Sequence, residues 1–419
     1  MDTAPRAARL RGMSDLPVRR PRFLDRRSPP HIATLILLSA LAALTMNIFL
    51  PSLPGMTAHF DTDYRLMQLS VALYLAVNAA MQLFVGAISD RYGRRPVLLW
   101  GVGLFLVATL GCLLAGTVWV FLAFRMMQAT IVTGMVLSRA VVRDMVPERE
   151  AASMIGYVTM GMAVAPMIGP AIGGALDAVF GWQASFWTLF AIGALVLALT
   201  WLDLGETAPE SRAGFAAQMR GWPELLTSPR FWGYTVTLGL SSGAFFAYLG
   251  GAPYVGDRVF GMNPATFGLV FGAPAVGYFT GNFLSGRFSV RVGVNRMVLW
   301  GTLINAGGVS LSLALFHLGL GTPASFFGLM TCVGLGNGMV IPNATSGALS
   351  VRPHLAGTAA GLSGALMIGV GAGLSALAGA LLTPGSGALP LLWIMVVTAL
   401  GAMLSIALVI RRERRLAGL

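Results

Sequence analysis

The chain has 419 residues and a net charge of +12, with 56% of its residues hydrophobic and only 11% charged. Because soluble domains contain about 25% charged residues, this composition excludes an ordinary soluble protein and predicts an all-α polytopic membrane protein. All 28 basic residues are arginines, so the chain lacks the lysine that a phosphate-binding loop or a Schiff base needs. The arginines fall in loops and tails rather than along one polar face, and we therefore expect no nucleic-acid partner.

The residue types that bind metals are also poorly placed for that purpose. The four histidines are scattered near the ends of apolar runs and have no metal-ligand spacing. Cys112 and Cys332 lie inside apolar runs and are expected to be small apolar core residues. We expect no metal site and no cofactor, and no Ser/His/Asp set supports an enzyme.

Residues 1–31 open the chain with eight arginines, several prolines and little apolar content, which predicts a disordered tail. Twelve apolar runs follow, each near the roughly 20 residues that a membrane-spanning helix needs. They cover approximately 32–54, 67–88, 96–116, 119–139, 153–177, 182–202, 230–252, 265–287, 295–317, 322–345, 355–382 and 388–410. An even number of spans puts both termini on one side, and the arginine-rich loops identify that side as cytoplasmic.

The longest link between spans, residues 203–229, divides the chain into bundles of six spans at 32–202 and 230–410, with a basic tail at 411–419. An internal repeat supports this division. Gly86, Arg91, Gly93, Trp100 and Gly101 recur 200 residues later as Gly286, Arg291, Gly293, Trp300 and Gly301. The second copy is degenerate, because Val290 stands where the first copy has Asp90. Two parallel halves predict a transporter with its substrate site at the midplane between them.

The short link between the second and third spans holds a dense cluster of charged residues and glycines. It contains Gly86, Asp90, Arg91, Gly93, Arg94 and Arg95. The pattern Gly-x-x-x-Asp-Arg-x-Gly-Arg-Arg resembles the signature loop of the major facilitator superfamily, whose fold has twelve helices in two pseudo-symmetric six-helix bundles. An ordinary cytoplasmic loop would explain the arginines, but not the spacing of Asp90 and the two glycines.

The inner end of the fourth span, with Arg139 and Asp144, resembles the basic and acidic exit of that span in the same superfamily. The resemblance implies that Asp144 pairs with Arg91 or Arg94 in a cytoplasmic gate. It also implies that Asp90 sits at the N-terminus of the eleventh span, where a carboxylate is stabilised. The alternative is a set of surface charges with little mutual energy.

The fifth span contains small residues and prolines at regular spacing. Gly169, Pro170, Gly173 and Gly174 lie in this pattern, and such small residues permit close approach of helices. The segment resembles the antiporter motif of the superfamily, although Ala165 replaces an expected glycine. A generic close-packed helix is the alternative.

Two polar residues lie inside spans of the first bundle at similar depth. Arg125 is about 9 Å and Asn47 about 10 Å below the outer ends of their spans at 1.5 Å per residue. An intramembrane charge is costly and should face a bundle interior or a watery cavity, so we hypothesise that the two residues line one polar site. The alternatives are a snorkelling arginine and a helix-packing asparagine. Further lining candidates are Phe49, Tyr74, Asn78, Tyr157, Phe245, Tyr248, Tyr278 and Asn337, each of which could instead serve packing.

The segment from Asn47 to Pro54, the segment from Arg139 to Asp144 and the pair Glu206-Thr207 resemble the Bcr/CflA branch of bacterial drug exporters, which includes bicyclomycin-, chloramphenicol- and florfenicol-resistance proteins. The resemblance implies a monomer of the bacterial inner membrane that exports small amphipathic drugs or metabolites in exchange for protons. That branch usually has an acidic residue at the position of Asn47, and asparagine cannot titrate. An uncoupled or exchange-type facilitator of small metabolites is therefore the alternative.

Overall fold

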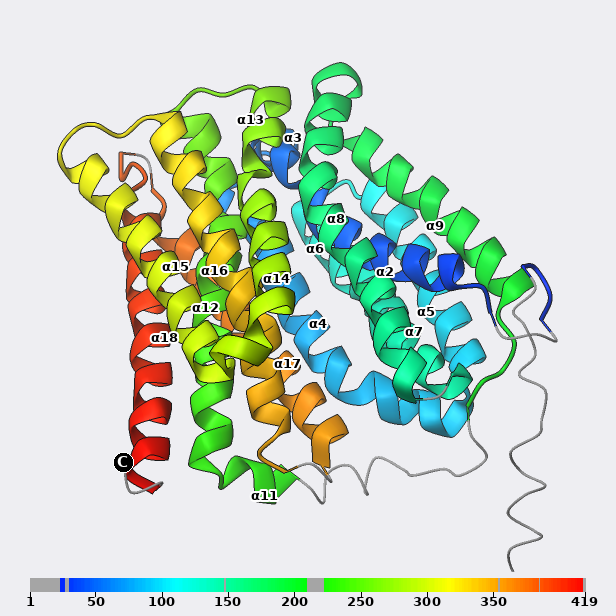
Figure 1. Ribbon diagram of the computed structural model, residues 1–419. Coiled ribbons are helices and arrows are strands. Elements are labelled where there is room, and N and C mark those ends of the chain that lie inside the picture. The colour runs from blue at the N-terminus through cyan, green and yellow to red at the C-terminus, as the bar shows by residue number, and fades with distance from the viewer. Residues whose placement is uncertain are drawn as a thin grey trace, which may run out of the picture.

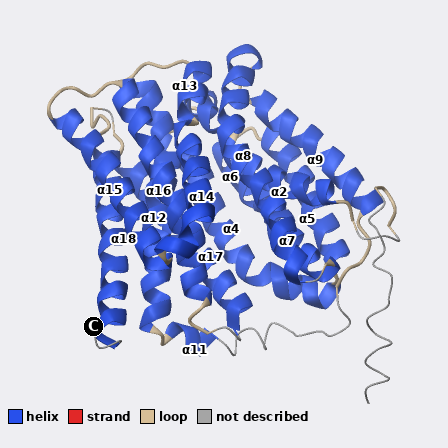
Figure 2. Ribbon diagram, viewed as in Figure 1, coloured by secondary structure: helices blue, strands red, loops and turns tan. Residues whose placement is uncertain are grey.

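The computed structural model describes residues 23–26, 30–146, 148–208, 222–352, 355–383 and 385–416. These residues form helices joined by short loops, with no strand among them (Figure 2). Ten helices in this part of the chain are long and apolar enough to cross a membrane. Ten of the twelve predicted spans are thus confirmed. The other two correspond to α8, of which Ile168–Phe180 forms a shorter apolar helix, and to α12, which has 26 residues.

The first half of the chain forms one group of helices. It contains α2 (Ile32–Asn47), η1 (Leu50–Ser52), α3 (Leu53–His59), α4 (Tyr64–Tyr92), α5 (Arg94–Leu113), α6 (Val118–Met127), η2 (Gln128–Ile131), α7 (Val132–Met145), α8 (Glu148–Phe180) and α9 (Gln183–Asp203). The predicted first span is therefore α2, η1 and α3 in succession, because Pro51 and Pro54 interrupt the backbone hydrogen bonding of a continuous helix. The fourth span is likewise divided by the tighter turn η2.

The second half forms a similar group. It contains α11 (Trp222–Leu226), α12 (Pro229–Tyr254), η3 (Val255–Val259), α13 (Pro264–Phe271), α14 (Ala273–Val292), α15 (Val294–His317), α16 (Pro323–Leu349), α17 (Ala356–Leu381) and α18 (Leu389–Leu416). Helix starts follow local capping chemistry. Asn263 caps α13 by accepting from Thr266 N at 2.8 Å, and Thr322 caps α16 in a reciprocal pair with Ser325.

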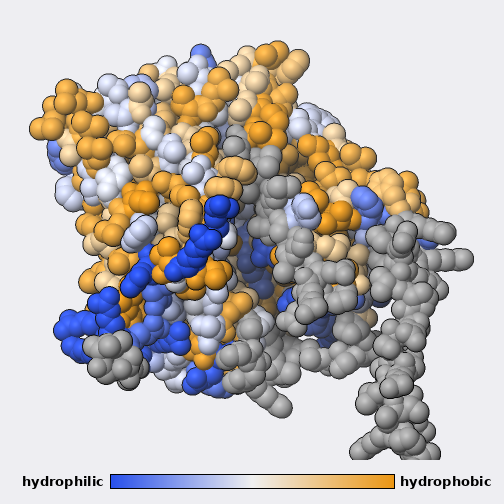
Figure 3. Space-filling model, viewed as in Figure 1, coloured by the Kyte–Doolittle hydropathy of each residue, from blue (hydrophilic) through white to orange (hydrophobic). Residues whose placement is uncertain are grey.

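The two groups form two bundles that stand side by side, with α4 and α17 between them (Figure 1). We call the end that carries Arg94, Arg143, Arg230 and Arg352 the arginine-rich end; it lies at the bottom of Figure 1, together with α11 and the C-terminus. In Figure 3, most of the strongly hydrophilic surface lies in the lower half of the molecule, and apolar surface dominates the upper half. This distribution fits helices embedded in lipid with one charged end outside it.

Both predicted tails are ordered in part. Leu24 N and His31 N each donate to the fully buried carboxylate of Asp203 at 2.8 Å, and Thr34 Oγ1 donates to it at 2.7 Å. Leu24 and His31 are therefore attached to the end of α9. Residues 1–22 and 27–29 of the predicted tail lie outside the described residues. At the other terminus α18 continues to Leu416, so the expected basic tail at 411–419 is largely helix.

The bundles contact each other closely at the end opposite to the arginine-rich one. A methyl group added to Gly174 of α8 would clash with the carbonyl oxygen of Pro264 in α13, and one added to Gly268 of α13 would clash with that of Pro170 in α8. The two helices thus touch backbone to backbone through reciprocal glycines. Small residues in the predicted antiporter-type segment account for this approach.

A polar contact between α4 and α17 reinforces the same closure. Gln68 is 1% exposed, and its amide donates to Ser375 O at 2.6 Å and to Ser375 Oγ at 2.9 Å. Gly250 of α12 and Gly379 of α17 lie flat against the Gln68 side chain, which a methyl group at either position would displace. The Gln68 amide is therefore enclosed by the opposite bundle.

Candidate functional site

Arg125 lies at the end of α6, just before the break at η2, and none of its surface is exposed. Its Nε donates to Ser70 O at 3.3 Å, its Nη2 to Thr45 O at 3.0 Å and its Nη1 to Gln128 Oε1 at 2.7 Å. No carboxylate contacts it among the described residues. A buried charge must be compensated by hydrogen bonds, and these three acceptors from α2, α4 and η2 provide that compensation.

Aromatic rings complete the enclosure of the Arg125 guanidinium. Its carbon lies 4.2 Å from the ring centre of Phe49 and 4.1 Å from that of Tyr74. Rings at this distance attract a cation through their electron-rich faces. The Gln128 amide in turn donates to Thr109 Oγ1 at 2.8 Å, which extends the network to α5. Arg125 therefore connects the helices of the first bundle and has no accessible surface in this conformation.

Asn47 is also fully buried, but its side chain contacts other groups than Arg125 does. Its Nδ2 donates to Ala43 O at 2.7 Å, and its Oδ1 has no partner among the described residues. The nearest small residue on α8 is Gly169, at which an added methyl group would lie 3.7 Å from the Asn47 Cβ. The proposal that Asn47 and Arg125 line one polar site stays a prediction.

The other predicted lining residues fall into separate groups. Tyr74 belongs to the Arg125 enclosure, while Asn78 accepts from Gln82 Nε2 at 2.8 Å one turn further along α4. Tyr157 of α8 is 54% exposed. In the second bundle, Tyr248 donates to Phe271 O at 3.0 Å and stacks on Phe245 and Phe271, and Asn337 accepts from Ser241 Oγ at 2.7 Å. Tyr278 lies on α14 opposite Arg139.

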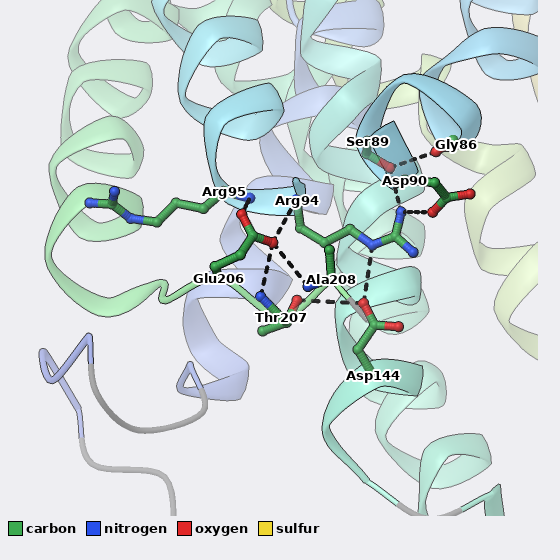
Figure 4. A network of polar contacts seen from close by, with 9 residues as sticks. All are labelled: Gly86, Ser89, Asp90, Arg94, Arg95, Asp144, Glu206, Thr207 and Ala208. Carbon is green, nitrogen blue, oxygen red and sulfur yellow. Dashed lines mark hydrogen bonds and ion pairs between the residues drawn. The ribbon is translucent and has the colours of Figure 1, made fainter. Parts of the chain in front are cut away.

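The arginine-rich end of the first bundle contains the charged cluster shown in Figure 4. Arg94 is 7% exposed and stands between two carboxylates. Its Nε donates to Asp144 Oδ2 at 3.0 Å, and its Nη1 pairs with Asp90 and also donates to Ser89 Oγ. Of the two predicted partners of Asp144, the structure selects Arg94. The exposed Arg91 instead lies over the ring of Tyr92.

Asp90 does not contact the N-terminus of α17 among the described residues. Its carboxylate instead pairs with Arg94, the first residue of α5, across the turn at Gly93. The ion pairs of the cluster among the described residues therefore lie within the first bundle. The predicted cytoplasmic gate, which needs contacts to the second bundle, stays a prediction for another conformation.

Glu206 is the residue of this cluster whose role the sequence did not reveal. Its carboxylate accepts from Arg94 N at 2.8 Å and Arg95 N at 3.3 Å, the first amides of α5, and from Thr207 N and Ala208 N at 3.0 and 2.9 Å. A carboxylate is stabilised by the free amides and the dipole at a helix N-terminus. The signal available in the sequence was a helix that begins directly after Gly93 without a capping side chain of its own.

Gly93 is required at this turn for two reasons. Its φ of +97° lies in the region that residues with a Cβ avoid, and a methyl group there would clash with the Glu206 carboxylate. Arg95 completes the junction, since its Nε donates to Leu204 O at 2.8 Å and its Nη2 to Trp201 O at 3.3 Å. The turn between α4 and α5 is thereby fixed to the end of α9.

Arg139, which the sequence assigned to the gate, lies apart from this cluster. Its Nη2 contacts the Met162 sulfur of α8 at 3.3 Å, and its Nε is enclosed without a hydrogen-bond partner among the described residues. The guanidinium interacts electrostatically with Tyr278 of α14 in the second bundle. Arg139 thus faces the boundary between the bundles, whereas Arg94 and Asp144 serve the first bundle alone.

Two bundles of membrane-spanning helices, closed against each other at one end, define a membrane transporter rather than an enzyme. Residues 35–367 and 257–418 match the family described as the Major Facilitator Superfamily. The chain is 33% identical over 372 residues to the uncharacterized MFS-type transporter YdgK of Bacillus subtilis (strain 168), covering 87% of this chain and 91% of that one. The chain therefore belongs to the Major Facilitator Superfamily.

Two further similarities support this assignment. A chloramphenicol resistance protein of Pseudomonas aeruginosa is 34% identical over 339 residues, which is 78% of each chain. The solved structure of a bacterial homolog of the human lysosomal transporter Spinster, in an inward-facing and unoccupied conformation, aligns with a TM-score of 0.70 at 18% identity and covers 91% of this chain and 96% of that one. The resemblance to the Bcr/CflA type of exporter is confirmed at the level of the family and its named relatives.

Proposed function

We propose that this chain exports small amphipathic drugs or metabolites across the bacterial inner membrane in exchange for protons. It does so by alternating access, with both termini and the arginine-rich end in the cytoplasm. The observation that carries the proposal is the asymmetry of contact between the bundles. Reciprocal glycines of α8 and α13 and the enclosed Gln68 join them at the opposite end, whereas the cluster around Arg94 engages only its own bundle. This is the arrangement expected of a cavity open toward the cytoplasm.

The relative named as a chloramphenicol resistance protein supports a drug as the transported class. The positive-inside rule supports the orientation, because the loops at the arginine-rich end carry most of the arginines between spans. A monomer provides the whole transport unit in this proposal, since both bundles are present in one chain.

The direct test is a drug-accumulation assay in an efflux-deficient bacterial host. Expression of the chain should lower the cellular accumulation of chloramphenicol, and Arg125→Ala should abolish this effect while the protein remains in the membrane. The physical reason is that the guanidinium joins α2, α4 and η2, so its loss leaves three buried acceptors without a donor. Arg65→Ala, which removes an exposed arginine at the start of α4, is the matched control and should leave efflux unchanged. Normal efflux by the Arg125→Ala protein would contradict the proposal for this residue.

Asn47 supports a second candidate, an uncoupled or exchange-type facilitator of small metabolites. Its amide is enclosed and bonded to Ala43 O, and an amide does not titrate. Proteoliposomes with and without a pH gradient distinguish the two functions. Proton-coupled export predicts that substrate accumulates against its concentration gradient, and that this accumulation disappears when the pH gradient is collapsed. Asn47→Asp should make the accumulation depend more strongly on the pH gradient. Transport that only equilibrates the substrate, at a rate independent of the pH gradient, would establish the facilitator.

A further inference from the structure

Arg139, at the boundary between the bundles, pairs with no carboxylate among the described residues. Its Nε is enclosed without a partner, and the Met162 sulfur that its Nη2 contacts is a weak acceptor. Arg143, one turn further along α7, adds a second positive charge nearby. Leaving a largely enclosed charge without a partner is strongly unfavourable, and this guanidinium has hydrogen-bonding capacity that the described residues do not fill.

The sequence excludes a carboxylate partner from the neighbouring spans. No aspartate or glutamate occurs between Glu150 and Asp177, in α8, or between Asp257 and Glu413, which covers α13 to α17. Asp144, the acidic residue at the end of the same helix, is held by Arg94 at 3.0 Å. Among the described residues no carboxylate is therefore left for Arg139, and an acceptor on a bound molecule would fit its free Nε.

Arg139 lies between the two bundles, one turn before the arginine-rich end of α7. Met162 comes from α8 of the first bundle and Tyr278 from α14 of the second, and these two helices pack against each other. Arg125, by contrast, is fully enclosed and has acceptors for all three of its nitrogen atoms within its own bundle. Arg139 is thus the arginine with hydrogen-bonding capacity left for a ligand.

We infer that Arg139, assisted by the hydroxyl of Tyr278, binds a planar two-oxygen acceptor group of the transported molecule, such as an aryl carboxylate or an aryl nitro group. The planar fork of a guanidinium matches two parallel hydrogen bonds to such a group. The inference rests on the proposed export function and specifies its substrate class. Cationic molecules without such a group are not ligands of this residue.

The test measures binding by the purified full chain in detergent for three probes: chloramphenicol, which carries an aryl nitro group; nalidixate, an aryl carboxylate; and ethidium, a cation that has neither group. Arg139→Met keeps most of the stem and removes the charge. It should weaken binding of chloramphenicol and nalidixate at least tenfold and leave the affinity for ethidium unchanged. Arg139→Lys, which keeps the charge but not the planar fork, should give an intermediate loss. Arg65→Ala, which removes an exposed arginine at the start of α4, is the matched control without loss. Tyr278→Phe should weaken the same two probes by a smaller factor.

Thermal stability separates a ligand-binding role from a structural one. Arg139→Met should leave the melting temperature of the ligand-free protein equal or higher, because it removes a charge that pairs with no carboxylate among the described residues. A lower melting temperature with an equal loss for all three probes would overturn the inference, as would unchanged binding of chloramphenicol and nalidixate. A loss confined to one of these two probes would sustain the inference and identify whether nitro or carboxylate is the recognised group.

The outcome for export is read separately. Arg139-dependent binding by a protein that lowers no drug accumulation in cells would support the binding site and contradict the export function. Export of chloramphenicol that Arg139→Met leaves intact would support export and contradict the site.

Discussion

The two copies of the repeated turn have the same backbone but are held by different contacts. Gly93 between α4 and α5 has φ and ψ of 97° and 152°, and Gly293 between α14 and α15 has 90° and 147°. In the first bundle the turn is filled by the Glu206 carboxylate, which accepts from the two amides that follow Gly93. In the second bundle a methyl group added to Gly293 would meet no atom within 4 Å.

The surroundings of the second turn are correspondingly open. A pocket of about 350 Å³ lies beside Gly293, lined among others by Arg230, Tyr234 and Arg296. Glu413 lies at the end of α18, the last helix of the second bundle, just as Glu206 follows the last helix of the first. Its carboxylate accepts from the Asn295 side chain and pairs with Arg230 at 2.9 Å, instead of capping α15. The comparison shows that glycine sets the path of the chain in both copies, whereas a carboxylate that caps the following helix is found at the first copy.

The largest difference is expected at the arginines of the two clusters. Arg94→Ala leaves Asp90 and Asp144 without their shared partner, so we expect a loss of about 2–3 kcal/mol in the free energy of unfolding, below the range for fully buried pairs because Asp90 is partly exposed. Arg230→Ala, which breaks an exposed pair, should cost less than about 1 kcal/mol. Thermal unfolding in detergent measures both. Equal losses would show that the two clusters contribute alike.

A smaller difference is expected at the glycines. Gly293→Ala should cost about 1–3 kcal/mol, the penalty of a Cβ in an extended backbone conformation with positive φ that essentially only glycine adopts. Gly93→Ala adds the displacement of Glu206 to this penalty and should cost clearly more. The double variant Gly93→Ala with Glu206→Ala tests this reason. When Glu206 is already alanine, adding Gly93→Ala should cost little more than Gly293→Ala does, because no carboxylate is left to displace. An unchanged extra loss would assign it to the backbone rather than to the carboxylate.

The smallest effect is expected from restoring the missing acid of the second copy. Val290 is 95% exposed, so Val290→Asp should change the free energy of unfolding by no more than about 0.5 kcal/mol. Asp90→Val, the reciprocal change, removes one of the two carboxylates of Arg94 and should cost more. A stabilisation by Val290→Asp comparable to the loss from Asp90→Val would show that the acid acts equally well in both turns.

The sequence by itself determined the class of fold and the order of its parts. The length of the apolar runs predicts spanning helices because a bilayer leaves no water to satisfy an irregular backbone, and ten of the twelve are confirmed. The repeat around Gly93 and Gly293 predicted two related turns, and the spacing of Gly169, Gly173 and Gly174 predicted close packing of α8. These features depend on residues that act locally or through a fixed helical period, so a linear pattern is sufficient to reveal them.

The tertiary structure alone decided which polar groups meet. Arg94 rather than Arg91 binds Asp144, Glu206 caps a helix that begins 112 residues earlier, and Gln68 is enclosed by residues some 307 positions away. It also separated two arginines of the fourth span, because Arg125 has acceptors from its own bundle, whereas the Nε of Arg139 has none among the described residues. The physical reason is that hydrogen bonds depend on distances and directions set by the packing of whole helices, and these are not encoded in the spacing of residues along the chain.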